Sequence, residues 1–174
     1  MAVEPDTVVT MPVLALRGLT IFPNMLLHFD VSRDTSIKAL DQAMSEGLPI
    51  FLVAQRDLSV EEPGQEDLYH IGTISNVKQI LRLPGGNVRV MVEGSSRGRL
   101  LGLSQSAPFL QGAVEYLPVP EHTRNTPKTE ALIRSTYELF ESYAGLSPRM
   151  TGDVLISVLA SDDPGYIADY IAQN

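Results

Sequence analysis

The sequence contains no cysteine and no tryptophan, and it has very few lysines. The absence of cysteine excludes disulfides, thiolate metal sites and cysteine nucleophiles. The formal net charge of −8 at pH 7 repels the phosphate backbone of nucleic acids, and the arginines are scattered rather than gathered in a basic patch. We therefore expect a protein that does not bind nucleic acid.

Long apolar runs are also missing from the sequence. No run approaches the roughly 20 residues of a membrane-spanning helix, and no basic residue precedes Arg17, although a secretory signal or a transit peptide would need one. The composition, 44% hydrophobic and 20% charged, is ordinary for a globular protein. These features predict no membrane partner and a cytoplasmic location.

Motifs for catalysis, cofactors and metals are absent as well. The sequence has no GxxxxGK[ST] phosphate loop, no HExxH spacing and no calcium-loop order of carboxylates. The acidic run at residues 61–67 is more typical of a solvated loop than of a cation site, and Asp163, which precedes Pro164, is better placed to cap a helix than to catalyse. Wide separation favours surface positions over a metal site for the three histidines, His28, His70 and His122. We expect no catalytic, cofactor-binding or metal-binding residue in this chain.

The chain is organised around residues 12–31, where two apolar runs flank a loop with the sequence FPNM at residues 22–25. Beyond the loop, apolar and polar residues alternate with the period of a half-buried strand, and Leu26 is the single exception. One face of this strand carries Met25, Leu27, Phe29 and Val31. The stretch predicts a strand, an exposed loop and a second strand.

Most of the following sequence predicts further strands, with one helix among them. The helix is expected over residues 34–46, where Ser32 or Asp34 can cap its start and Gly47 ends it. Gly72 within a long strand suggests a bulge or a close backbone approach. The predicted strands cover residues 50–54, 69–83, 88–92, 97–103 and 109–117, and residues 84–87 form a hairpin turn. Six or seven strands with one inserted helix make an α+β sheet structure that is closed or half closed.

A proline-rich stretch separates this part from a helical one. After it the apolar spacing changes from the strand period to the helix period, and three short helices are expected, the first ending at Gly145. Their starts are marked by Thr126-Pro127, Ser147-Pro148 and Asp163-Pro164. The last helix reaches Asn174 without a terminating signal, so we expect a fragment truncated at its C-terminal end. The predicted organisation is a β-rich part (residues 1–117), a linker (118–127) and a helical part (128–174).

Five pieces of the sequence, in this order, resemble the N-terminal domain of Lon, the ATP-dependent protease. They are PVLALRGLTIFPNM, SIKALDQAM, FLVAQRD, EPGQEDLYHIGTISNVKQILRLPGGNVRVMVEGSSRGRL and DPGYIADYIA. Two positions depart from the family pattern. Gly18 stands where an acidic residue is common, and Gly98, between Arg97 and Arg99, is expected to loosen its strand.

The resemblance implies a PUA-like pseudo-barrel of about six strands with one inserted helix, followed by a small α-helical subdomain. It implies that the parent is a bacterial, cytoplasmic serine protease of protein quality control and the stress response, which degrades misfolded, damaged and short-lived regulatory proteins. That parent would be a homohexamer with an AAA+ ATPase that binds ATP and Mg, and its Ser-Lys dyad would lie outside residues 1–174. This fragment would be a non-catalytic module for substrate recognition and hexamer assembly. Its partners would be unfolded or damaged proteins and further copies of itself.

The candidate substrate-binding residues lie in the loop at residues 22–25 and at the hairpin tip. An exposed apolar tip with a flexible, polarizable methionine suits a surface that accepts many sequences. The alternative is that Phe22 and Met25 fill the barrel interior. The candidate set is Phe22, Pro23, Met25, Leu81, Leu83 and Pro84. Two other functions stay open, a stand-alone PUA-like module that binds RNA or protein and an enzyme complete within 174 residues.

Overall fold

The computed structural model describes residues 7–117, 126–148 and 150–174. The chain forms two compact units, residues 1–118 and residues 119–174, which we call the β unit and the helical unit. The predicted linker at residues 118–127 lies outside the described residues except for its last two. Those two, Thr126 and Pro127, cap and begin the first helix of the helical unit. The linker itself stays a prediction.

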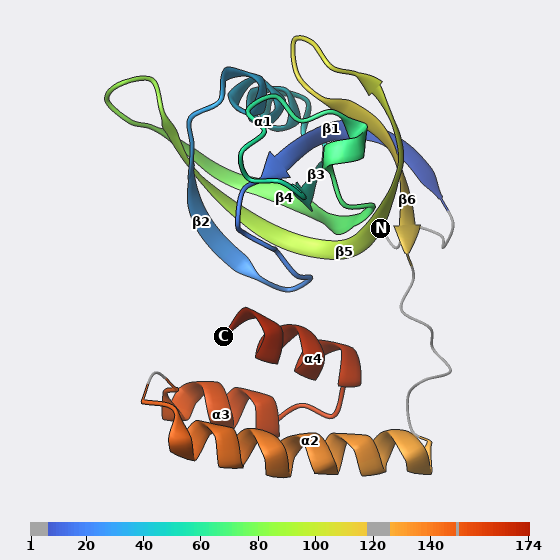
Figure 1. The fold of residues 1–174 in the computed structure, drawn as a ribbon, viewed down its shortest axis with the longest axis vertical. Coiled ribbons are helices and arrows are strands. Elements are labelled where there is room, and N and C mark those ends of the chain that lie inside the picture. Colours follow the sequence, from blue (N-terminus) through green and yellow to red (C-terminus); the bar gives the residue numbers. More distant parts are fainter. Residues whose placement is uncertain (1–6, 118–125, 149) are drawn as a thin grey trace. The chain divides into compact units, whose positions relative to one another are not determined.

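The β unit is a mixed sheet that closes on itself (Figure 1). The strand order is β2-β5-β4-β3-β1-β6, and β5 also pairs with β6, so that five strands form a ring and β2 remains at an edge. The elements are β1 (Val8–Leu16), β2 (Leu26–Val31), α1 (Asp34–Glu46), β3 (Ile50–Ala54), β4 (Ile71–Arg82), β5 (Val88–Gln105) and β6 (Gln111–Leu117). This confirms the α+β barrel of about six strands with one inserted helix.

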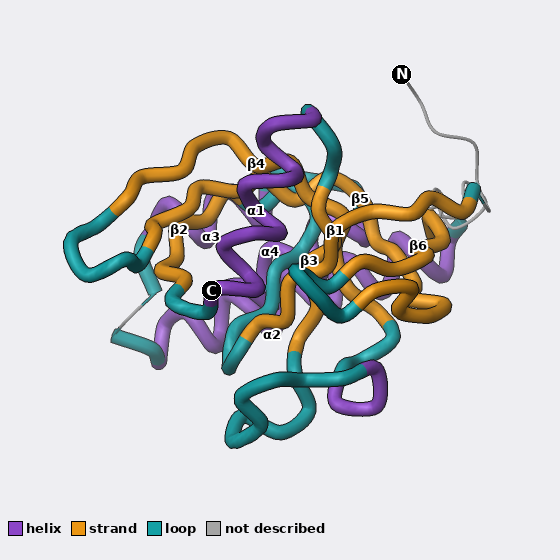
Figure 2. Tube along the Cα trace, turned by 90° about the horizontal axis from the view of Figure 1, so that it is seen from above, coloured by secondary structure: helices purple, strands orange, loops and turns teal. Residues whose placement is uncertain are grey.

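The central strands β1 and β3 are parallel to each other and buried on both faces. Successive side chains of a strand point to opposite faces, and each face belongs to a different apolar cluster. Val13 and Phe51 join one cluster, whereas Leu14 and Leu52 join the other, against which α1 packs. α1 contacts β1 most extensively and also touches β3 and β4 (Figure 2). The buried central strand predicted at residues 50–54 is confirmed.

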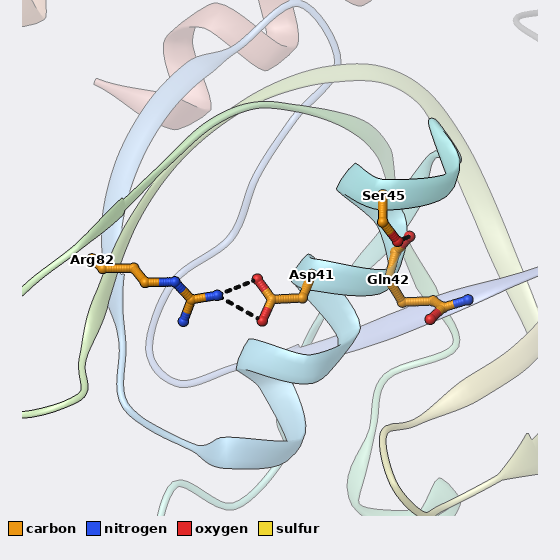
Figure 3. A network of polar contacts seen from close by, with 4 residues as sticks. All are labelled: Asp41, Gln42, Ser45 and Arg82. Atoms are coloured by element: carbon orange, nitrogen blue, oxygen red, sulfur yellow. Dashed lines mark hydrogen bonds and ion pairs between the residues drawn. The ribbon is translucent and has the colours of Figure 1, made fainter.

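Helix α1 begins and ends where the sequence predicts. Gly47 has a φ of 64°, the left-handed conformation that ends a helix, as expected. The expectation that Ser32 or Asp34 caps the start is wrong, because Arg33 is the N-cap and no side chain accepts a hydrogen bond from the first turn. On the outer surface, Arg82 of β4 binds both carboxylate oxygens of Asp41 at 3.0 Å (Figure 3).

β5 is one strand of 18 residues, although the sequence predicts two separate pieces at residues 88–92 and 97–103. Close packing requires glycine at two positions of this part of the sheet. Gly72 of β4 and Gly98 of β5 are cross-strand partners, and both lie against the ring of Phe51. A Cβ at Gly98 would lie 2.8 Å from Val114 Cγ1, so this glycine fits its strand rather than loosening it. The close approach predicted at Gly72 is confirmed, since a Cβ there would lie 2.4 Å from the Leu52 carbonyl oxygen.

The helical unit contains α2 (Pro127–Leu146), α3 (Gly152–Leu159) and α4 (Pro164–Gln173). Asp163 caps α4 by accepting a hydrogen bond from the Gly165 N–H at 2.8 Å, as predicted. Gly145 lies inside α2, and α3 begins later than Ser147-Pro148 suggests. The small core of the unit is formed by Phe140, Val158 and Ile167. Of the helices that the structure describes, none is long and apolar enough to cross a membrane.

Candidate functional site

Residues 22–25 form a tight turn at the start of β2. The Met25 N–H donates a hydrogen bond to the Phe22 carbonyl oxygen at 3.3 Å, and Asn24 has a φ of 64°. Proline fixes the backbone at the second position of a type II turn, and asparagine tolerates the positive φ of the third position. The FPNM sequence therefore specifies this turn locally.

The turn is attached to β5 at Gly94. The Asn24 N–H donates to the Gly94 carbonyl oxygen, and the Gly94 N–H donates to the Met25 carbonyl oxygen, both at 2.9 Å. A Cβ at Gly94 would lie only 2.2 Å from the Phe22 carbonyl oxygen. On the other side, the Thr73 hydroxyl donates to the Ile21 carbonyl oxygen. The backbone of the turn is thus held in place by β4 and β5.

The side chains of the turn differ in their surroundings. Met25 is half-buried and packs against the apolar cluster under α1, so it supports the core as the alternative interpretation proposed. Phe22 and Pro23 are also half-buried, and their neighbour Leu26 is 58% exposed. The binding role of Phe22, Pro23 and Met25 stays a prediction.

The hairpin tip lies away from the turn. Leu81 is 52% exposed, Pro84 is exposed and Leu83 is half-buried. Leu26 pairs with Glu93 at one end of β2, and Val31 pairs with Val88 next to the hairpin tip at the other end. Five steps along a strand separate these ends by roughly 17 Å, and Figure 1 shows the hairpin tip at the far end of β2 from the turn. The two sets of candidate residues therefore lie at opposite ends of β2, and the binding role of the hairpin tip stays a prediction.

The outer edge of β2 was not predicted from the sequence. In the described part of the chain, β2 pairs with β5 alone, so alternate N–H and C=O groups along its other side have no partner strand. Leu26 is the first residue of β2. In the sequence it interrupts the alternation of apolar and polar residues, and this interruption could have indicated an exposed apolar group here. We call Phe22, Pro23, Leu26 and the outer edge of β2 the turn-edge surface.

Little net charge accompanies this surface. Asp30 of β2 is bound by Arg89 of β5 at 2.7 Å and 2.9 Å. The hydrogen bond from Arg89 lowers the pKa of the Asp30 carboxyl, so the carboxylate stays ionised to a lower pH than an isolated aspartate would. The two charges offset each other beside the edge.

His28 is exposed on β2, and His122 lies outside the described residues. No three His, Asp or Glu side chains in the described ranges are grouped so that they could hold a metal ion.

Comparison with known proteins relates the chain to one family in each case. The family model of the ATP-dependent protease La (LON) substrate-binding domain matches residues 10–174. Lon protease of Clostridioides difficile (strain 630) is 41% identical over 94% of this chain and 21% of its own length. Lon protease 1 of Bacillus subtilis (strain 168) is 35% identical over 95% of this chain and 21% of its own length. The chain therefore spans about a fifth of the length of these curated relatives.

Two solved structures share the fold. The N-terminal domain of Mycobacterium avium complex Lon protease has a TM-score of 0.71 and 23% identity, over 92% of this chain and 80% of that one. The Lon N-terminal domain protein from Xanthomonas campestris has a TM-score of 0.57 and 14% identity, over 95% of this chain and 98% of that one. At these identities the likeness concerns the fold alone.

Proposed function

The chain belongs to the substrate-binding domain family of the ATP-dependent protease Lon, and from this membership we propose that it binds exposed apolar segments of unfolded or damaged proteins. It is an N-terminal substrate-binding domain of Lon protease. In the parent protein it passes captured segments to an ATP-driven pore in a homohexamer of the bacterial cytoplasm. ATP, Mg and the Ser-Lys dyad belong to other parts of that parent, and the 174 residues here recognise rather than cleave.

The turn-edge surface is the observation that supports this proposal most directly. An extended chain can add to an open strand edge through main-chain hydrogen bonds, which do not depend on sequence, and can place alternate side chains on neighbouring apolar groups. Here the edge of β2 begins at Leu26, 58% exposed, next to Phe22 and Pro23. Such a surface suits substrates that share only exposed apolar residues and an unfolded backbone.

Weak binding by each domain fits this role. Several linked copies raise the apparent affinity through effective concentration, and the weak individual contacts permit release during translocation. Hexamer assembly thus strengthens capture without a tight single site. The formal net charge of −8 disfavours the alternative of an RNA-binding module.

Replacing Phe22 or Leu26 by serine is expected to weaken binding of an unfolded protein roughly 5- to 30-fold, because each removes an apolar contact worth about 1 to 2 kcal/mol. The melting temperature should change little, since neither side chain belongs to a buried cluster. Binding is measured by fluorescence anisotropy with a labelled, permanently unfolded protein, and stability by thermal denaturation of the same samples.

Leu101→Ser is the matched control, because Leu101 is 49% exposed on β5 and lies outside the turn-edge surface. It should leave binding unchanged. Met25→Ser should lower the melting temperature, since Met25 packs on the core. Leu81→Ser, measured in the same two assays, tests separately whether the hairpin tip contributes to binding of the unfolded protein. A large fall in melting temperature for Phe22→Ser, with a proportionate loss of binding, would assign Phe22 to the core and refute the site.

A further inference from the structure

A cleft of about 210 Å³ opens between the end of β1, the end of β2 and the start of α1. Leu14, Leu16, Leu19 and Phe29 give it apolar walls. Its volume is below the roughly 300 to 1,000 Å³ of pockets that bury drug-sized ligands. The cleft therefore has room for the end of a peptide chain or for one side chain. Its polar lining includes Arg17, Arg33 and Ser36, none of which has a role in the turn-edge surface.

The start of α1 places the partial positive charge of the helix dipole beside this cleft. The first intrahelical hydrogen bond runs from the Ile37 N–H to the Arg33 carbonyl oxygen at 2.9 Å, and no side chain caps the turn before it. The N–H groups of the first helical residues lie at the positive end of the helix dipole, where a negative group is stabilised. Arg33, the N-cap residue, itself lines the cleft.

Ser36 is the polar residue within α1 that lines the cleft. The residue as a whole is only 7% exposed. In the described part of the chain its hydroxyl has no hydrogen-bond partner, unlike those of Ser45 and Ser75. Solvent reaches this hydroxyl oxygen, since no side-chain oxygen or nitrogen of the described residues is both buried and without a hydrogen-bond partner. The Ser36 hydroxyl is therefore available to a ligand oxygen within the cleft.

Two guanidinium groups meet beside the same cleft. Arg17 donates to the Val60 carbonyl oxygen at 3.0 Å, and Arg33 donates to that same oxygen at 3.3 Å and to Gln55 Oε1 at 2.8 Å. Neither guanidinium forms an ion pair with a carboxylate of the described residues. Burial and then the charge of Arg17 lower the pKa of Arg33, while Glu61 acts in the opposite direction. A negative charge between the two arginines would relieve their repulsion.

The surrounding charges limit the ligand to one negative charge. Asp30 also lines the cleft, but Arg89 holds and neutralises it. Asp34 begins α1 and Glu61 lies near Arg33, so a dianion such as phosphate would meet more repulsion than a single carboxylate. Apolar walls next to the arginines fit a carboxylate carried on an apolar stem.

We propose that this cleft binds a carboxylate of a substrate peptide, with the carboxylate at Ser36, Arg17, Arg33 and the start of α1 and its apolar stem against Leu19 and Phe29. The inference rests on the proposed function, since it names a chemical feature by which substrates are recognised. The carboxylate comes either from a chain terminus or from an acidic side chain. Both sources have the same chemistry and are separated by experiment.

The test uses three short fluorescent peptides with the same apolar sequence. One has a free C-terminal carboxylate, one is amidated, and one is amidated but contains a single aspartate. The free acid, the aspartate peptide or both should bind the wild-type chain at least roughly tenfold more tightly than the neutral amide, because charged hydrogen bonds are lost with the amide. Equal affinity for all three peptides would overturn the proposal.

Two variants assign the preference to the cleft. Ser36→Ala and Arg17→Met should each reduce the preference for a carboxylate several-fold, while the affinity for the neutral amide stays the same. Arg82→Met is the matched control, because it also removes one positive charge but acts on Asp41 on the outer face of α1 (Figure 3). An equal loss in Arg82→Met would show a general charge effect and would refute the site. Thermal denaturation verifies that each variant is folded.

Binding of a permanently unfolded protein, measured in parallel, separates this inference from the proposed function. If the unfolded protein binds but no peptide shows a preference for a carboxylate, the cleft is not a carboxylate site and the proposed function stands. If a carboxylate peptide binds through Ser36 and Arg17 but the unfolded protein does not bind, the cleft stands as a carboxylate site and the proposed function fails.

Discussion

Replacing Gly72 by alanine is expected to lower the free energy of unfolding of the β unit by about 2 to 3 kcal/mol, the range of a strongly overpacked core. The added Cβ would lie 2.4 Å from the Leu52 carbonyl oxygen and 2.7 Å from Phe51 Cζ. A ring atom can move, but a backbone oxygen of a central strand cannot move alone. β4 must therefore shift away from β3, with which it pairs at Thr73 and Leu52. Chemical denaturation of the whole chain measures the loss.

Gly102→Ala is the control for this experiment. Gly102 also lies in a strand of the β unit, but the nearest atom that its added Cβ would meet among the described residues is Gln65 Oε1, at an ordinary 3.6 Å. We expect this variant to be as stable as the wild type or slightly more stable, since alanine loses less backbone freedom on folding. Equal stability of the Gly72 and Gly102 variants would contradict the close packing of β3 and β4 at Gly72.

Gly94→Ala is expected to affect both stability and binding. Its Cβ would meet the Phe22 carbonyl oxygen at 2.2 Å, so the turn at residues 22–25 must leave β5. We expect a loss of about 1 to 3 kcal/mol in unfolding free energy, together with a loss of unfolded-protein binding at least as large as that of Phe22→Ser. Hydrogen exchange should show faster exchange of the Asn24 N–H and the Gly94 N–H, because both hydrogen bonds join the turn to β5.

Gly98→Ala distinguishes this local effect from general destabilisation. The Cβ at Gly98 would crowd side chains of Val114, Ile74 and Phe51, and it would not meet the turn. This variant should lose stability but should bind as the wild type does when compared at equal amounts of folded protein. If Gly94→Ala also retained full binding, the turn would not be part of the substrate site.

The sequence predicts best those features that are specified locally. Helix α1 was placed within its observed bounds because its apolar spacing and Gly47 act within a few residues of each other. The alternation along β2 is confirmed for the same reason, with Val31 buried and His28 exposed. The turn at residues 22–25 follows from a proline and an asparagine in consecutive positions.

Features that depend on distant residues were not predictable in this way. Gly98 suggests a loosened strand until Phe51 is placed beside it, and the need for glycine at position 94 is apparent only when Phe22 is placed beside it. The strand register likewise decides that Leu81 and Phe22 lie at opposite ends of β2. The cleft requires the end of β1 to meet the start of α1, so no spacing along the chain connects Arg17 with Ser36.

The ring of strands also sets an order of events during synthesis. Within the β unit, β1 precedes the other described strands in chain order but pairs with β6, so that Val8 meets Glu115 only after nearly the whole β unit has been translated. At typical translation rates this delay lasts roughly 5 to 20 seconds. During that time β1 lacks its antiparallel neighbour, and pairing between such distant segments is intrinsically slow. The nascent β unit thus displays, for a short period, the unpaired first half of an apolar strand, a segment of the kind that the finished domain is proposed to capture.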